Sequence, residues 1–191
     1  MSSPPFPSIG ELDGLSEDAC RAALAPLFEG AKSFIARLVA ARPFGDEQGL
    51  IDAAYQVGRE LPETDAVELV NAHPRVGSGP ASMSPMSQVE QGYDATDGDA
   101  DAEEPWVDEE LGGLNEVYEE RFGFRYVVFV AGRPRSAILP LIEMSLRNDR
   151  EAELRRAVMD CVAIAEDRLW TLRGGRPDGG EADDQAAEDP A

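Results

Sequence analysis

The sequence predicts an all-α protein, a single-domain bundle of about seven to nine helices. Apolar residues recur at helical spacing in one segment after another. Prolines and glycines separate these segments, as expected between helices. One run, residues 124–130, has the aromatic and branched composition of a strand, but it has no obvious hairpin partner. We therefore expect this run to be an extended connector packed among the helices.

Four helices are predicted in the N-terminal half of the chain. Ser16 is a suitable N-cap for the first of them. Pro43 ends the second helix and Pro62 ends the third, because proline cannot continue an α-helix. Thr64 or Asp65 can cap the fourth. The four predicted helices span residues 16–28, 32–41, 46–61 and 64–72.

The C-terminal half begins with a loop, because prolines and glycines are concentrated in residues 74–80. Residues 94–104 are acidic and poor in apolar side chains, so we expect them to form an exposed excursion. The extended connector separates a long helix from two later ones. The predicted helices of this half span residues 85–91, 107–122, 136–147 and 151–173.

The two ends of the chain differ in composition from the segment between them. Residues 1–8 are rich in proline and serine and are expected to be flexible, and residues 174–191 are expected to be a disordered acidic tail. Residues 9–173 are expected to form one domain, large enough to bury its own core. The sequence has no recognisable signal peptide and no apolar stretch of membrane-spanning length. A cytoplasmic protein is therefore the default expectation.

The charge of the protein limits its partners. With 38 acidic and 17 basic residues, the formal net charge is -21. This balance argues against binding to nucleic acid or to anionic membranes, both of which attract clustered basic residues. Cys20 and Cys161 lie in apolar helical patterns and are expected to be buried, reduced thiols, although a disulfide or a metal site remains an alternative.

Three side chains could carry chemistry. His73 is the only histidine, and it lies where Pro74 must end a helix; the partial negative charge of a helix C-terminus would favour its protonated form. Glu90 could bind a substrate or pair with His73. Arg168 could grip a planar amide or carboxylate. Each residue also has a purely structural interpretation: a packed histidine, a capping box formed by Ser87 and Glu90, and a solvated or ion-paired arginine.

Several segments follow one another in an order typical of one enzyme family. They are Asn71-Ala72-His73-Pro74-Arg75-Val76-Gly77, Ser87-x-x-Glu90-Gln91, Leu114-Asn115-x-x-Tyr118-x-x-Arg121-Phe122-Gly123-Phe124 and Ile164-Ala165-x-x-Arg168-Leu169. In this combination the sequence resembles the 2-oxo-4-hydroxy-4-carboxy-5-ureidoimidazoline (OHCU) decarboxylase family. The resemblance covers about residues 28–172, beginning at the pair Phe28-Glu29.

The resemblance implies an all-α, usually dimeric enzyme of urate degradation. Its members decarboxylate OHCU to (S)-allantoin without a metal or an organic cofactor. By resemblance His73 and Glu90 are the catalytic pair, and the substrate is a small molecule. The resemblance also implies a set of substrate-binding residues: Pro74, Ser87, Gln91, Arg168 and the extended run Tyr126, Val127, Val128, Phe129 and Val130.

The sequence departs from the family pattern at two places. Gly92-Tyr93-Asp94 follows Gln91, where the family usually has Ala-Gly-Leu or similar, and Arg125 stands where the family often has proline. Two alternatives therefore stay open. One is a divergent decarboxylase or lyase of another ureido acid. The other is a non-catalytic helical binding module, in which His73 and Glu90 merely end and cap helices.

Overall fold

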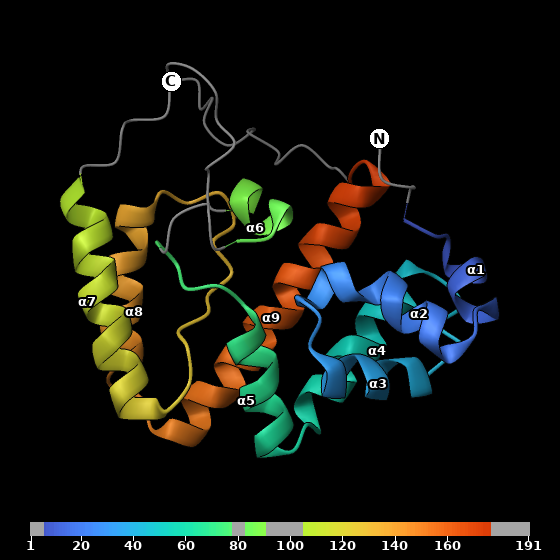
Figure 1. Cartoon of the computed structure of the whole chain (residues 1–191), viewed down its shortest axis with the longest axis horizontal. Helices are drawn as coiled ribbons and strands as arrows, with labels where there is room; N and C mark the ends of the chain where they lie inside the picture. The colour runs from blue at the N-terminus through green and yellow to red at the C-terminus, as the bar shows by residue number, and fades with distance from the viewer. Residues whose placement is uncertain (1–5, 78–82, 91–104, 177–191) are drawn as a thin grey trace, which may run out of the picture.

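The computed structural model of the chain describes residues 6–77, 83–90 and 105–176. Within these ranges every regular element is a helix, so the predicted all-α class is confirmed (Figure 1). None of the described helices is both long enough and apolar enough to cross a membrane. The predicted exposed excursion, and most of the predicted acidic tail, lie outside the described residues.

The N-terminal half forms five α-helices and one short 3-10 helix. The predicted first helix is divided, because its second half tightens into a 3-10 turn that contains Pro26. The elements are α1 (Ile9–Gly14), α2 (Glu17–Leu24), η1 (Ala25–Phe28), α3 (Lys32–Ala40), α4 (Glu47–Arg59) and α5 (Glu63–Ala72).

Two of these helices begin differently from the prediction. The sequence analysis did not predict α1, although Ser8 and Glu11 form a complete capping box at its start. The prediction that Thr64 or Asp65 caps α5 was wrong, because the helix begins at Glu63 with Pro62 as its N-cap residue. Asp65 instead pairs with an arginine of α3 at 2.9 Å.

The C-terminal half contains the longest helices. Asp149 caps the last one by accepting a hydrogen bond from a backbone N–H, and Gly174 ends it in the left-handed conformation that glycine adopts easily. The elements are α6 (Pro85–Glu90), α7 (Pro105–Phe122), η3 (Arg135–Ile138), α8 (Leu139–Ser145) and α9 (Arg150–Arg173).

Helix α9 is the central element of the fold. It runs diagonally through the molecule and packs against α4, α5 and η1, while α7 and α8 pack against each other on the other side (Figure 1). Its buried side chains join the main apolar core, and both cysteines are buried as predicted. Because α9 is buried along most of its length, the elements that pack against it are held in fixed positions relative to one another.

Residues 125–130 form neither helix nor strand and pair with no strand among the described residues, which agrees with the extended connector predicted for residues 124–130. Their backbone polar groups still need partners when they are buried. Side chains supply several of these partners: Arg156 of α9 donates to the Val127 carbonyl at 3.0 Å, and Arg133 donates to the Val130 carbonyl at 2.8 Å. The segment is thus held by arginines where a sheet would use a neighbouring strand.

A buried polar network holds Arg156 in place. Glu153 is fully buried and accepts hydrogen bonds from Arg156 at 2.5 Å, from the Tyr118 hydroxyl at 2.5 Å and from Asn148 at 2.7 Å. Burial raises the pKa of Glu153, but these donors outweigh burial and leave the pKa below its ordinary value. The carboxylate therefore stays ionised and orients the arginine that anchors the extended segment.

Candidate active site

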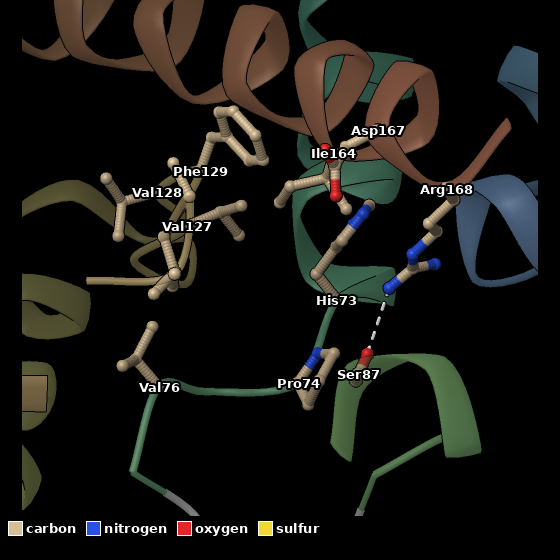
Figure 2. Close-up of a pocket in the computed structure, with 13 residues that line it drawn as sticks. His73, Pro74, Val76, Ser87, Val127, Val128, Phe129, Ile164, Asp167 and Arg168 are labelled. Atoms are coloured by element: carbon tan, nitrogen blue, oxygen red, sulfur yellow. Dashed lines mark hydrogen bonds between the residues drawn. The ribbon is translucent and has the colours of Figure 1, made fainter. Parts of the chain in front are cut away.

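A pocket of about 60 Å³ lies where the end of α5, the start of α6, the extended segment and α9 meet (Figure 2). His73 stands on one side and the residues around Val128 on the other, with Ile164 of α9 above them and Pro74 below in this view. The lining residues are His73, Pro74, Val76, Ser87, Val127, Val128, Phe129, Val130, Ala131, Gly132, Ile164, Asp167 and Arg168.

The imidazole of His73 is held in one tautomer. It is only 2% exposed, and its Nδ1 lies 3.1 Å from the Leu69 carbonyl oxygen, which can only accept a hydrogen bond. Nδ1 therefore carries the proton, and Nε2 of the neutral ring keeps a lone pair. Among the described residues Nε2 is buried without a hydrogen-bond partner. This is the arrangement of a base whose partner is a ligand.

The electrostatics of His73 differ from the expectation based on the helix terminus. Burial and the nearby Arg168 charge lower its pKa to about 4, although the Leu69 hydrogen bond and Glu29 act in the opposite direction. Loss of hydration outweighs the favourable helix end, so the imidazole of the free protein is neutral at pH 7. The sequence could not reveal this, because burial is a property of the tertiary structure.

Arg168 is buried and bound on several sides by the protein. Its Nη1 donates to the carbonyls of Pro26 and Leu27, at 3.0 and 3.3 Å, and its Nη2 donates to Glu29 at 2.7 Å and to Ser87 at 3.0 Å. The interpretation of Arg168 as a solvated surface arginine is therefore wrong, whereas its ion-paired character is clear. Its predicted contact with a substrate remains a prediction.

Ser87 reaches the pocket from inside α6. The interpretation of Ser87 as the N-cap of this helix was wrong, because the helix begins at Pro85 and the Ser84 hydroxyl accepts the Ser87 backbone N–H at 3.2 Å. The Ser87 hydroxyl therefore caps no helix; it donates to Glu29 at 2.7 Å and accepts from Arg168 at 3.0 Å. The side chain of Glu90 and the whole of Gln91 lie outside the described part of the structure, so their predicted roles remain predictions.

The extended segment forms the wall opposite His73. Val127 to Val130 line the pocket, whereas Tyr126 does not: its ring packs 5.0 Å from that of Tyr118, centroid to centroid, and lies under the Arg156 guanidinium. The predicted contact of these residues with a substrate remains a prediction. Among the described residues no hydrogen bond uses the peptide N–H or C=O of Val128. A ligand with amide edges could pair with these groups.

Arg125 occupies the position where the family often has proline, and it makes hydrogen bonds that proline could not make. Its backbone N–H, which proline would lack, donates to the Asn71 side chain at 2.9 Å. Its guanidinium donates to the carbonyls of Asn71 and His73, at 3.0 and 2.9 Å. The substitution thus ties the extended segment to the turn that carries the histidine.

Six residues at this site were not predicted from the sequence. Five of them line the pocket, namely Val76, Ala131, Gly132, Ile164 and Asp167. The sixth, Glu29, binds both Arg168 and Ser87. Val76 and Ile164 stood in the segments that resemble the family, but nothing in their apolar type suggested a site. The described residues contain no group of three or more His, Cys, Asp or Glu side chains placed to hold a metal ion.

Comparison with known proteins identifies the family of the chain. The family model for OHCU decarboxylase matches residues 13–170, most of the chain. The chain belongs to the OHCU decarboxylase family. The match includes the His-Pro turn and the four elements that meet at the pocket.

Individual relatives of this family member are distant. The chain is 28% identical over 162 residues to the uric acid degradation bifunctional protein PucL of Bacillus subtilis (strain 168), covering 85% of this chain and 32% of that protein. It is 26% identical over 162 residues to 2-oxo-4-hydroxy-4-carboxy-5-ureidoimidazoline decarboxylase of Haloferax volcanii, covering 85% and 94%. The chain thus spans about a third of the bifunctional relatives and nearly all of the single-function one.

The fold of this family member also matches solved structures. A crystal structure of OHCU decarboxylase in the presence of (S)-allantoin superposes with a TM-score of 0.63 at 21% identity, covering 84% of this chain and 99% of the other. A crystal structure of (S)-allantoin synthase gives a TM-score of 0.60 at 16% identity, with coverages of 87% and 54%. At these identities the likeness establishes the fold.

Proposed function

We propose that this protein decarboxylates OHCU to (S)-allantoin in urate degradation, with His73 as its acid–base group. The observation that carries the proposal is the buried, neutral imidazole of His73, whose Nε2 has no partner among the described residues and which lines a pocket. Membership of the family supplies the substrate class. A pocket that combines this base with the Val128 peptide, whose N–H and C=O make no hydrogen bond among the described residues, suits a small, amide-rich carboxylic acid.

The chemistry needs few groups from the protein. When the carbon–carbon bond to the carboxylate breaks, its electron pair must be delocalised, and the imine-like and carbonyl groups of the substrate ring can accept it. The protein then has to position the substrate, move one proton and favour one face of the ring. Nε2 of His73 can accept the hydroxyl proton and return a proton to the ring, and Glu90 can orient His73 or hold the hydroxyl.

The low pKa of His73 in the free protein fits a site that is completed by an anionic substrate. A pKa of about 4 makes the imidazole a weak base while the pocket is empty. A carboxylate bound nearby would favour the protonated ring and raise this pKa toward neutrality. The substrate thereby activates the group that acts on it. The Val128 peptide can pair with the ureido edge, and Arg168 can add positive charge.

The alternatives make different predictions. A divergent decarboxylase would turn over another ureido acid faster than OHCU, and the segment Gly92-Tyr93-Asp94 is the reason to consider it. A non-catalytic helical module would turn over neither compound. The buried imidazole favours catalysis over binding alone, since a packed histidine in a purely structural role is expected to satisfy both of its ring nitrogens.

The decisive experiment is turnover of freshly generated OHCU, followed by circular dichroism as optically active allantoin forms. With the wild-type protein, the allantoin formed should be mostly the (S) enantiomer, in contrast to the product of the uncatalysed reaction. Replacement of His73 by Ala or of Glu90 by Gln should remove most of the activity, by about 10²–10⁴-fold for a general acid–base group. Full activity in a folded His73→Ala variant would rule out the assignment of His73.

We also propose a homodimer, on the strength of the family resemblance, and a cytoplasmic location. Light scattering of the purified protein tests the first and fractionation of cells that express it tests the second. A monomeric mass across the concentration range used for the activity assay would contradict the dimer.

A further inference from the structure

Glu29 has an unusual backbone conformation next to the pocket. It follows η1 with φ 49° and ψ 30°, in the left-handed region that side chains with a Cβ rarely adopt, and Gly30 comes directly after it. Only one other non-glycine residue in the described chain has a positive φ, Ala131, and it lines the pocket itself. Backbone strain of this kind persists only where surrounding contacts hold the residue in place, and such residues are concentrated at functional sites.

The side chain of Glu29 joins three elements through one carboxylate oxygen. Oε1 accepts hydrogen bonds from Arg168 Nη2 of α9 at 2.7 Å, from the Ser87 hydroxyl of α6 at 2.7 Å and from the Ser84 hydroxyl at 2.8 Å. Arg168 and Ser87 line the pocket, whereas Glu29 does not. The carboxylate therefore lies behind the pocket wall and holds two of its polar groups.

The charge of Glu29 is maintained in this position. Burial raises its pKa, but the Arg168 charge and the hydrogen bonds from Ser87, Ser84 and Arg168 outweigh burial, so the pKa lies below its ordinary value. The side chain of Arg168 is 1% exposed and that of Glu29 is 13% exposed. A buried guanidinium of this kind requires a counter-charge, and Glu29 supplies it.

The network also fixes the direction of the hydrogen bonds that Ser87 can make. A serine hydroxyl has one proton and two lone pairs. Glu29 can only accept, so the Ser87 proton points toward Glu29. Arg168 Nη2 can only donate, so it occupies one lone pair of Ser87 at 3.0 Å. The Ser84 hydroxyl lies 3.2 Å from that of Ser87, but its single proton is donated to the Glu29 carboxylate at 2.8 Å, so one lone pair of Ser87 is left for a ligand. A ligand in the pocket then meets Ser87 as an acceptor, which suits an N–H group rather than a carbonyl or a carboxylate.

We propose that Glu29 is a positioning residue: it fixes Arg168 and orients the Ser87 hydroxyl as the acceptor for a ureido N–H of the substrate. This inference rests on the proposed decarboxylase function and adds a specificity determinant to it. Ser87 then selects the ureido group, and the carboxylate of the substrate is expected to lie elsewhere in the pocket, because the Ser87 proton is not available to it.

Two replacements of Glu29 separate its side chain from its backbone. Glu29→Gly removes the carboxylate but relieves the left-handed strain, since glycine adopts this conformation without penalty. Glu29→Gln keeps the shape and loses the charge. If the carboxylate positions the site, both variants should lose about 10- to 100-fold in kcat/KM, the range expected for a hydrogen bond to a charged group. Wild-type kcat/KM in folded Glu29→Gly protein would overturn the proposal.

Glu68 offers a matched control. Like Glu29, it is a carboxylate that accepts a hydrogen bond from a serine, Ser33, and it also accepts the backbone N–H of Lys32 at 2.8 Å, but it does not line or contact the pocket. Glu68→Gln should lower the thermal midpoint and leave kcat/KM unchanged in the folded protein. An equal loss of kcat/KM in Glu68→Gln and Glu29→Gln would show a general effect of stability and would overturn the positioning role.

A double-mutant cycle tests whether Glu29 acts through Ser87. If it does, the double variant Glu29→Gln/Ser87→Ala should have a kcat/KM much less than tenfold below that of Ser87→Ala alone. Losses of kcat/KM that multiply, as for independent residues, would overturn the proposal. Should the wild-type protein fail to turn over OHCU, the proposed function fails. The free energies of unfolding of the same four proteins, measured in urea, then test whether Glu29 and Ser87 interact. Additive losses of stability would overturn the proposal that Glu29 positions Ser87.

Discussion

The buried histidine should make the stability of this protein depend on pH in a specific window. An unfolded histidine titrates near 6.5, whereas in the folded protein burial and Arg168 lower the pKa of His73 to about 4. Between these values the unfolded chain binds a proton that the folded protein does not. Stability therefore rises with pH through this window and is lost as the pH falls from 6.5 toward 4.

The size of the effect follows from the shift. A difference of about 2.5 pKa units, at about 1.4 kcal/mol per unit, corresponds to about 3.5 kcal/mol in full, of which about 3 kcal/mol is lost between pH 7.5 and pH 4. Since His73 is 2% exposed, solvent screening reduces this figure little. The carboxylates with lowered pKa values, Glu29 and Glu153, also lose stabilising interactions at low pH. A variant without the histidine is needed to separate these contributions.

His73→Gln provides this comparison, because glutamine does not titrate and its amide can still donate to the Leu69 carbonyl. Urea unfolding of both proteins at half-unit steps from pH 4 to pH 7.5 should show the wild type losing about 3 kcal/mol more than the variant on acidification. A difference between the two proteins that stays constant with pH would refute the reasoning. The acidic limb of kcat/KM for the wild type should correspondingly reach well below pH 6.

Three further changes have calculable outcomes. Tyr118→Phe leaves the buried Glu153 carboxylate without one of its donors and should lower the free energy of unfolding by about 1–3 kcal/mol, measured in urea. Gly77→Ala should lower the free energy of unfolding by about 1 kcal/mol or more, because Gly77 has a φ of 79° and the new Cβ would lie 3.2 Å from the Leu111 side chain. An unchanged thermal midpoint would contradict this expectation. Arg125→Pro removes one backbone and two guanidinium hydrogen bonds to the turn at His73. The variant should have a lower thermal midpoint and a lower kcat/KM. Unchanged activity would show that these hydrogen bonds do not position the turn.

The sequence predicted the helices well because their periodicity is a local signal. Helices α3, α4, α7 and α9 lie within one or two residues of the predicted ranges, since prolines, glycines and caps mark their ends. Helix α1 was missed even though its capping box was visible, because it is short and its capping residue, Ser8, lies in the segment predicted to be flexible. The connector was predicted for residues 124–130 from the composition and the lack of a partner strand, and residues 125–130 indeed form no helix or strand.

The site was predictable only in part. Ordered segments of sequence identified His73, Ser87 and Arg168, which the fold brings together from three separate elements. Glu29 was visible only as part of the pair that opens the family resemblance, because its role depends on a left-handed backbone and on donors from residues 55 or more positions away. The neutral state of His73 was likewise unpredictable, since loss of hydration depends on packing.

Helix α9 explains how two walls of the pocket keep their relative position although the described residues form no sheet. Arg156 of α9 fixes the carbonyl of Val127 on one wall, and Arg168 of the same helix fixes Ser87 on another. The two arginines are separated by about 18 Å of rigid helix, at 1.5 Å per residue. Movement of either wall must therefore break a hydrogen bond to a helix that is buried along most of its length. The geometry of the site thus depends on α9 as a common reference, and changes that bend this helix between its two arginines should impair activity before they unfold the protein.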